Sequence, residues 1–244
     1  MLFRKAILMI HGFAGGVYDY EVLDHYLELN PLFDVYSFTL PGHGVSTKIK
    51  SKYTEWILKS EEEIDYLINN GYRTIYVIGH SMGGVIATYL ATKYKEIKKL
   101  VLVAPAFKYF YQKDDSLLDI LKKGNVLLKD YGYETVVSRF TKTSINSVKE
   151  FMSLVKNYYD TPKYIHIPTL IIQGLDDKIV PIESSKYVYN NLKGKKWLVY
   201  VKDTNHDVFK SRCVDEINRL IEEFLKRNII KDRVFTIGNL DNDV

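Results

Sequence analysis

The sequence has a single cysteine, no long apolar run and little net charge, and each shortage excludes a class of protein. Cys213 is alone among 244 residues, so the chain cannot form an intrachain disulfide and nothing indicates an oxidising compartment. The first apolar run follows Arg4 and Lys5 and ends before His11 after only five residues. It is too short for the apolar region of a signal peptide or for a membrane span. We therefore expect a cytoplasmic protein with no stable membrane insertion.

The net charge of +4 is the small difference between 34 basic and 30 acidic residues. Short lysine clusters lie at the expected ends of helices and strands, which favours lysines that are simply exposed to solvent at the surface (Lys48, Lys50 and Lys52; Lys93, Lys95, Lys98 and Lys99). No nucleic-acid motif accompanies them, so we expect no nucleic-acid partner. The six histidines show no spacing typical of metal ligands, and we expect neither a metal nor a cofactor.

Strand-like runs alternate with helical stretches, which predicts an α/β fold with a mainly parallel sheet of about six strands flanked by helices. Several of these runs are apolar throughout, as in strands that are buried on both faces. Tyr53 to Asn70 has a helical apolar stripe between two of them. The expected strands are Ala6 to Ile10, Val35 to Thr39, Thr74 to Ile78, Leu100 to Ala104, Thr169 to Gln173 and Trp197 to Val201.

One long stretch, residues 107–163, contains no strand-like run and is too long for an ordinary crossover. Ile145, Val148, Met152 and Val155 recur there at helical spacing. We interpret it as a helical cap insertion over the carboxyl edge of the sheet, where open α/β sheets hold their sites; the alternative is a packing helix away from the site. The core then comprises residues 1–106 and 164–228, and residues 229–244 form a C-terminal tail whose role we leave unassigned.

The most informative motif is Gly79-His80-Ser81-Met82-Gly83, which follows a strand-like run and precedes an apolar helical stretch. Strand, Gly-x-Ser-x-Gly and helix together are typical of a nucleophile elbow. The tight turn leaves no room for side chains at its two glycines, and it holds the serine at its apex in a strained conformation. The pattern predicts that Ser81 is a catalytic nucleophile.

A serine hydroxyl needs a histidine to take its proton and a buried acid to orient that histidine. In nucleophile-elbow enzymes the acid and the histidine follow the serine along the chain. His206 comes after the last expected strand, at the correct edge of the sheet, whereas His166 comes just before a strand, at the wrong edge. The acid should follow the strand that ends at Gln173, where Asp176 and Asp177 both stand as candidates.

The negative charge that develops on a substrate carbonyl must meet preorganised donors. The backbone N–H of Met82 is one donor by position, because it follows the nucleophile at a helix start. Gly12, Gly15 and Gly16 mark a glycine-rich loop after the first strand, but they match neither a dinucleotide-binding nor a phosphate-binding pattern.

From Ala6 to about Phe224 the chain resembles the α/β-hydrolase superfamily, and more narrowly its carboxylesterase and monoacylglycerol lipase branch. The resemblance implies the α/β-hydrolase fold. The acid motif Gly-x-x-Asp-x-x-Val of that branch matches Gly174, Asp177 and Val180, which selects Asp177 as the acid. The His-Gly-x loop implies that the N–H of Phe13 is the second oxyanion donor and that His11 orders the loop. Almost nothing precedes the first strand, so the antiparallel N-terminal strands often seen in the family should be missing.

Aromatic residues just beyond the fourth expected strand, including Phe107 and Phe110, are candidates to contact an apolar substrate, or else form the cap's own core. We therefore expect a carboxylic ester hydrolase for small-molecule esters with short- to medium-chain acyl groups, monoacylglycerols included. Thioesterase, lysophospholipase and proline-iminopeptidase-like aminopeptidase activities remain alternatives, because fold and triad do not set the substrate. A non-enzymatic binding module is disfavoured, since serine, acid and histidine are all present in order. Peripheral lipid contact and the oligomeric state stay open.

Overall fold

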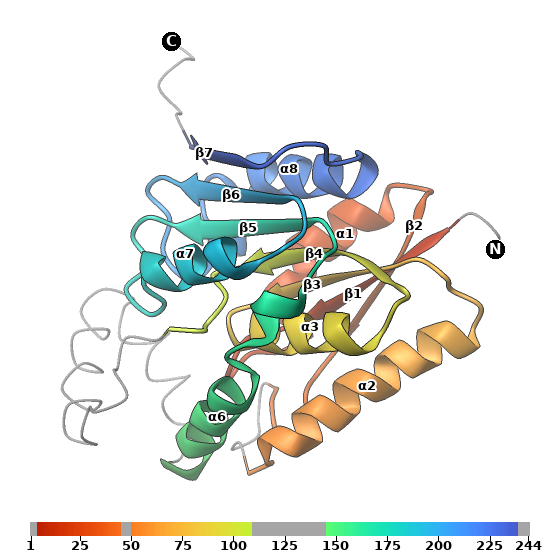
Figure 1. Ribbon diagram of the computed structural model, residues 1–244, viewed down its shortest axis with the longest axis vertical. Coiled ribbons are helices and arrows are strands. Elements are labelled where there is room, and N and C mark those ends of the chain that lie inside the picture. The colour runs from red at the N-terminus through yellow and green to blue at the C-terminus, as the bar shows by residue number, and fades with distance from the viewer. Residues whose placement is uncertain (1–3, 45–49, 109–144, 239–244) are drawn as a thin grey trace.

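The computed structural model describes residues 4–44, 50–108 and 145–238, which form an open sheet with helices on both faces (Figure 1). The sheet has seven strands in the order β2-β1-β3-β4-β5-β6-β7, and every neighbouring pair is parallel. The strands are β1 (Lys5–Ile10), β2 (Phe33–Phe38), β3 (Ile75–His80), β4 (Ile97–Val103), β5 (Thr169–Gly174), β6 (Lys196–Val201) and β7 (Arg233–Ile237). Because all seven run in one direction, the loops that follow them meet at a single carboxyl edge.

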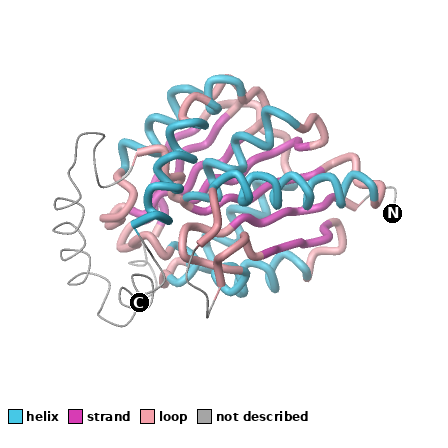
Figure 2. The backbone as a smooth tube through the Cα atoms, turned by 90° about the horizontal axis from the view of Figure 1, so that it is seen from below, coloured by secondary structure: helices cyan, strands magenta, loops and turns pink. Residues whose placement is uncertain are grey.

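Helices bury both faces of the sheet (Figure 2). One face packs against α2 (Tyr53–Asn69), α3 (Met82–Lys93), α6 (Ile145–Tyr158) and α7 (Ile182–Asn191), and the other against α1 (Glu21–Glu28) and α8 (Val214–Lys226). Short 3₁₀ turns occur at Val17–Tyr20, Thr161–Tyr164 and Val208–Lys210. Side chains alternate between the two faces along a strand, so Leu8 and Ile10 of β1 join one core while Ile7 and Met9 join the other.

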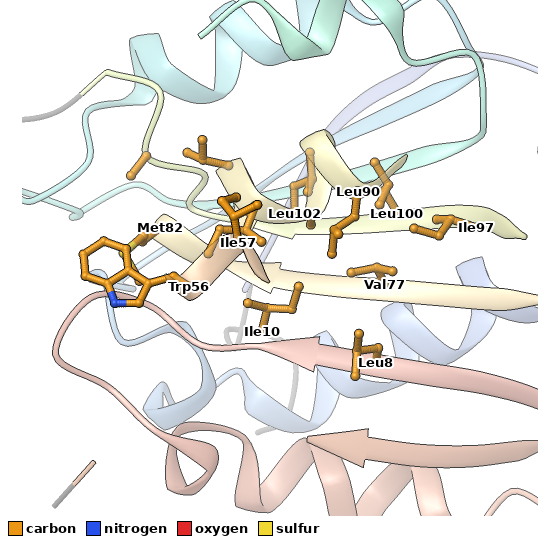
Figure 3. Packing of buried hydrophobic residues seen from close by; sticks show 14 of the residues in the cluster. Leu8, Ile10, Trp56, Ile57, Val77, Met82, Leu90, Ile97, Leu100 and Leu102 are labelled. Atoms are coloured by element: carbon orange, nitrogen blue, oxygen red, sulfur yellow. The ribbon is translucent and has the colours of Figure 1, made fainter. Parts of the chain in front are cut away.

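The core beneath α3 brings β1, β3 and β4 together around fully buried aliphatic side chains (Figure 3). Leu8, Val77 and Leu100 contribute from three adjacent strands. Trp56 of α2 and Met82, the first residue of α3, are both fully buried in this core. This packing anchors the start of α3, and with it the turn that precedes the helix.

All six expected strands are present, and the sheet agrees with the prediction of about six strands, with one strand more. The seventh, β7, lies in the tail after residue 228, and among the described strands it pairs with β6 alone. It forms an edge of the sheet, where one flank meets solvent, so the apolar pattern is interrupted by exposed Arg233, Val234 and Thr236. This mixed composition explains why the segment did not resemble the buried inner strands.

The described residues contain no antiparallel strand pair, and the first strand begins at Lys5. No helix in the described part of the chain combines the length and the apolar character that crossing a bilayer requires. Across the same ranges there is no group of three or more His, Cys, Asp or Glu side chains that could hold a metal ion.

Candidate active site

Ser81 occupies the sharp turn between β3 and α3 in a backbone conformation that is rare for a residue with a side chain. Its φ is 53° and its ψ is −115°, a region that costs free energy unless neighbouring structure enforces it. Three hydrogen bonds do so. The Ser81 N–H donates to the carbonyl of Val103 (2.8 Å), and the Ser81 carbonyl accepts from the N–H groups of Gly84 (3.0 Å) and Ala106 (3.1 Å).

Glycine is required on both sides of this turn because other backbone lies against it. A Cβ at Gly79 would be 2.4 Å from the carbonyl oxygen of Gly83, and a Cβ at Gly83 would be 1.9 Å from that of Ile10. Either side chain would collide with main-chain atoms that cannot rotate away. The two glycines therefore let the start of α3 approach the carboxyl end of β1 closely.

The loop after β1 passes directly beside the serine. A Cβ at Gly12 would lie 3.1 Å from the Cβ of Ser81, and the Gly15 N–H donates to the Gly12 carbonyl (3.1 Å) to close a tight turn. Phe13 lies within this turn, and Ala14 adopts a positive φ of 59°. The segment that contains the Phe13 N–H is thus held next to the elbow.

His11 uses both ring nitrogens to organise this loop. Its Nδ1–H donates to the Gly12 carbonyl (2.8 Å), and its Nε2 accepts the N–H of Leu40 (3.0 Å), which joins the loop after β1 to the loop after β2. Burial lowers the pKa of His11 to about 4, against a smaller opposing effect of the hydrogen bond to Gly12. The ring is therefore neutral at pH 7, which fits the ordering role expected of it.

His43, in the loop after β2, lies beside His11 and has a similar environment. Its Nδ1–H donates to the Pro41 carbonyl (3.1 Å), and its ring centroid is 5.2 Å from that of Trp56. Burial, followed by the charge of His11, lowers its pKa to about 4. Both side chains thus pack against the glycine-rich loop, His11 through Gly12 and His43 through Phe13.

Asp177 and His206 form a buried pair at the carboxyl edge. The Nδ1–H of His206 donates to Oδ2 of Asp177 (2.8 Å), while Oδ1 accepts the backbone N–H groups of Ile179 and Val180, both at 2.9 Å. Burial raises the pKa of Asp177, but the charge of His206 and the hydrogen bonds from His206, Val180 and Ile179 outweigh it, so the pKa is lowered. Asp177 is therefore ionised at neutral pH and orients the imidazole.

The loops that carry this pair are tied to each other and to the elbow. The Asp176 N–H donates to the Thr204 carbonyl (2.9 Å), and the side chain of Asp176 is exposed. His80, the residue before Ser81, donates from Nε2 to the backbone carbonyl of His206 (3.0 Å), and the two rings have their centroids 4.8 Å apart. The structure therefore brings His206 to the strand end that carries Ser81. His166, in contrast, is exposed and precedes β5 at the opposite edge.

Aromatic side chains lie above the glycine-rich loop and beyond β4. Phe151 of α6 stacks on Phe13, with centroids 5.4 Å apart and ring planes inclined by 27°. Phe107 is buried and packs against Tyr159 and Tyr187, at 6.4 Å and 6.0 Å. This is the environment of a core aromatic, and a substrate contact by Phe107 stays a prediction. Phe110 lies outside the described residues.

Sequence reasoning missed three residues that the structure places beside these groups. They are His80, which contacts the His206 loop, Phe151, which stacks on Phe13, and Gln173, whose amide contacts Asp177. Gln173 had a visible signal, because it is a polar residue directly after the apolar run Leu170 to Ile172 of a strand expected to be buried. His80 and Phe151 had none, since their partners are distant in sequence.

The family model described as alpha/beta hydrolase fold matches residues 5–155, and a second, described as PhoPQ-activated pathogenicity-related protein, matches residues 123–234. The chain is 24% identical over 231 residues to a carboxylesterase of Bacillus subtilis (strain 168), a match that covers 91% of this chain and 93% of the relative.

Solved structures share the architecture at lower identity. A monoacylglycerol lipase of Paleococcus ferrophilus superposes with a TM-score of 0.69 at 21% identity, over 90% of this chain and 93% of the other. A bromoperoxidase from Bacillus anthracis gives 0.72 at 18%, over 92% of each chain. The different names of these two neighbours illustrate that the fold alone does not assign a reaction. The parallel sheet, the strained serine turn and the family match over most of its length together establish that this chain belongs to the alpha/beta hydrolase fold family.

Proposed function

We propose that the protein is a serine hydrolase that cleaves carboxylic esters, with Ser81 as nucleophile, His206 as general base and Asp177 as the acid that orients it. The observation that carries the proposal is the strained serine elbow next to the buried Asp177–His206 pair. His80 links the two, because it precedes Ser81 and hydrogen-bonds to the backbone of His206. A strained, tightly held serine is costly, and such strain is typically kept at functional sites.

The roles follow from the hydrogen bonds of the pair. Asp177 is ionised and accepts the Nδ1–H of His206, which leaves Nε2 of the neutral imidazole without its proton. In the first half-reaction Nε2 takes the hydroxyl proton of Ser81 while Oγ attacks the ester carbonyl. When the tetrahedral intermediate collapses, that proton passes to the departing alcohol, and an acyl group remains on Ser81.

The second half-reaction repeats the sequence with water. His206 removes a proton from a water molecule, the resulting hydroxide attacks the acyl carbon, and the proton returns to Oγ of Ser81 as the carboxylic acid leaves. The imidazolium that forms in each step is stabilised by the carboxylate of Asp177. No other proton carrier is needed.

The N–H groups of Phe13 and Met82 are proposed to stabilise the oxyanion. Met82 is the first residue of α3, so its N–H has no carbonyl partner four residues earlier within the helix and lies at the positive end of the helix dipole. Gly12 lies against the Cβ of Ser81. This supports a position for the next N–H, that of Phe13, opposite the N–H of Met82 on the substrate oxyanion. Removal of one such donor typically costs about 10²- to 10³-fold in kcat.

We propose an apolar acyl group as the part of the substrate that is recognised. The half-buried ring of Phe13, which stacks on the buried ring of Phe151, provides an apolar surface next to the oxyanion donor. The similarity to proteins named as a carboxylesterase and a monoacylglycerol lipase supports carboxylic esters as the substrate class. Within that class we propose short- to medium-chain acyl esters, monoacylglycerols included. Phe107 is proposed to contribute from the loop after β4.

We also retain the proposal that residues 107–163 form a cap over a core of residues 1–106 and 164–228. Its described helix, α6, packs against α2 and α3 and brings Phe151 to the loop beside Ser81, which supports a cap rather than a remote packing helix (Figure 1). The tail includes β7, which supports a structural role for it at the edge of the sheet.

The decisive experiment replaces Ser81 with alanine and measures hydrolysis of p-nitrophenyl butyrate. The expected loss in kcat is about 10⁶-fold, as for removal of a nucleophile in other serine hydrolases. Ser37→Ala, which removes a hydroxyl at the β2 edge of the sheet, should retain full activity. A fluorophosphonate probe should label the wild type and Ser37→Ala but not Ser81→Ala. Undiminished hydrolysis by Ser81→Ala would refute the proposal.

A panel of substrates then separates the competing activities on the same triad. Butyryl and decanoyl esters, a monoacylglycerol, acyl thioesters, lysophospholipids and aminoacyl arylamides should be compared by kcat/KM. Higher values for the carboxylic esters are expected. A clear preference for thioesters or arylamides would redirect the assignment while leaving the nucleophile unchanged.

A further inference from the structure

Gln173 is a fully buried amide at the carboxyl end of β5, next to the candidate acid. Its Nε2 lies 3.2 Å from each of three oxygens, which are the carbonyls of Gly174 and Val180 and Oδ2 of Asp177. Its Oε1 accepts a hydrogen bond from the hydroxyl of Ser185 on α7 (2.6 Å). The orientation of the amide is therefore determined chemically, because an oxygen in place of Nε2 would face three acceptors and no donor.

Asp177 consequently has donors on both carboxylate oxygens. Oδ1 accepts two backbone N–H groups, whereas Oδ2 is shared by the Nδ1–H of His206 (2.8 Å) and the amide of Gln173 (3.2 Å). The two contacts on Oδ1 belong to the main chain and hardly vary with side-chain chemistry. The strength of the Oδ2 hydrogen bond to His206 therefore depends on Gln173.

We propose that Gln173 is a positioning residue that holds Oδ2 of Asp177 toward His206 and, by sharing the charge of that oxygen, sets the pH at which His206 acts as a base. Ser185 holds the amide in the orientation that this requires. The inference rests on the proposed function, in which the Asp177–His206 pair serves Ser81. Gln173 acts through Asp177 and makes no contact with the substrate in this scheme.

The sign of the effect follows from the competition for Oδ2. When the amide is removed, more of the carboxylate charge acts on His206, and the imidazolium form becomes more favourable. As the pH is lowered, the enzyme then loses its neutral base at a higher pH than the wild type does. The acidic limb of the kcat/KM profile therefore moves to higher pH. A merely structural role would lower the plateau or the stability but would leave the position of this limb unchanged.

Other ionisable groups near the pair stay the same in every variant below. His80, at the end of β3, lies against His206, and Asp177 faces it from the loop after β5. Asp176 and Lys178 flank Asp177 and are exposed, and Asp207 follows His206. A difference between variants therefore reports on Gln173 rather than on a neighbouring charge.

The test compares Gln173→Met, which keeps the length of the side chain and removes its donor, with Thr169→Val as the matched control. Thr169 is equally buried at the other end of β5, and its hydroxyl bonds only to the Ile167 carbonyl (3.2 Å) among the described residues. We expect the acidic limb of Gln173→Met to shift upward by about 0.5 pH units, equivalent to about a threefold change on that limb. KM should stay within about twofold of wild type, and Thr169→Val should superimpose on wild type.

A second readout is independent of catalysis. The proton resonance of His206 Nδ1–H, assigned by its loss in His206→Gln, should move to lower field in Gln173→Met because the hydrogen bond to Asp177 becomes stronger. Unchanged resonance and unchanged limb in a folded Gln173→Met protein would overturn the proposal. If Gln173→Met does not fold, Ser185→Ala provides the test. We expect the acidic limb and the proton resonance to shift in the same direction as predicted for Gln173→Met, but by less. Values that coincide with wild type would overturn the proposal. Absence of ester hydrolysis in the wild type would contradict the proposed function alone, since the proton shift still reports on Gln173.

Discussion

Replacing Asp177 with asparagine tests the proposed triad most directly, because the surrounding hydrogen bonds dictate how the new amide must lie. Two backbone N–H groups, from Ile179 and Val180, point at Oδ1. The amide oxygen of the variant has to remain there, since an NH₂ group would meet two main-chain donors, whereas at the position of Oδ2 it meets one donor, the amide of Gln173, and the ring of His206, whose tautomer can change. The NH₂ group of the asparagine therefore takes the place of Oδ2 and faces Nδ1 of His206.

This reversal changes the tautomer of the histidine. In the wild type Nδ1–H donates to Oδ2, whereas in Asp177→Asn Nδ1 must accept from the new NH₂ group. The ring proton then moves to Nε2, which can no longer take the hydroxyl proton of Ser81. For a triad with its acid replaced in this way, kcat falls by about 10⁴-fold, which corresponds to about 5.5 kcal/mol in the activation barrier.

The assay is kcat/KM for p-nitrophenyl butyrate at pH 7.5, with circular dichroism to confirm folding. Asp176→Asn is the matched control, because Asp176 precedes Asp177 directly, its side chain is exposed, and its link to Thr204 uses only the backbone N–H. It should retain activity within about twofold of wild type. Activity in Asp177→Asn above about a tenth of wild type, or a large loss in Asp176→Asn, would refute the assignment of the acid.

Two further predictions concern stability. The pKa of His11 is about 4 in the folded chain and about 6.5 when unfolded, so the unfolded state binds more protons between these values and stability falls as the pH drops through that window. His11 alone should contribute about 3 kcal/mol to the unfolding free energy lost from pH 6.5 to 4, beside a contribution of the same sign from His43. Urea titrations at several pH values should show that the unfolding free energy of His11→Gln falls less steeply with decreasing pH, and an unchanged dependence would contradict this origin. Lys99 donates from Nζ to three carbonyls at the end of α8, at 2.5–2.9 Å, so Lys99→Met should lower the unfolding free energy by about 1–3 kcal/mol. The exposed Lys98→Met should change it by less than about 0.5 kcal/mol, and equal losses would argue against a role for the buried ammonium.

The inner strands could be predicted from sequence because each is a run of apolar residues buried on both faces, such as Leu100 to Val103 in β4. The order of the strands could not, since no local pattern states which run lies beside which. The strand β7 escaped prediction because exposed Arg233, Val234 and Thr236 interrupt its apolar pattern. The strand at the other edge, β2, was predicted because none of its side chains is exposed and Phe33 and Phe38 are buried. Burial of most side chains is what makes a strand visible in a sequence.

The candidate site likewise has a part that the sequence predicted and a part that it left open. The elbow was predictable because its pattern is local, a Gly-x-Ser-x-Gly between a strand-like run and a helical stretch, and the carbonyl oxygen of Gly83 lies only 2.4 Å from the Cβ position of Gly79. The choice between Asp176 and Asp177 was not local, and the residues themselves left it open. In the structure Asp177 is buried against His206 while Asp176 is exposed, which supports the assignment that the resemblance implied.

The amino-acid sequence by itself determined the α/β class, the buried strands and the strained turn at Ser81, because hydrophobic periodicity and steric limits act between residues that are close along the chain. Only the tertiary structure decided that Gln173 contacts Asp177 and His80 contacts His206, that Phe151 stacks on Phe13, and that a seventh strand forms one edge of the sheet. Those contacts join parts of the chain up to 138 residues apart, as the pair Phe13 and Phe151 shows. Their geometry depends on how seven parallel strands are ordered and aligned, which no short segment encodes.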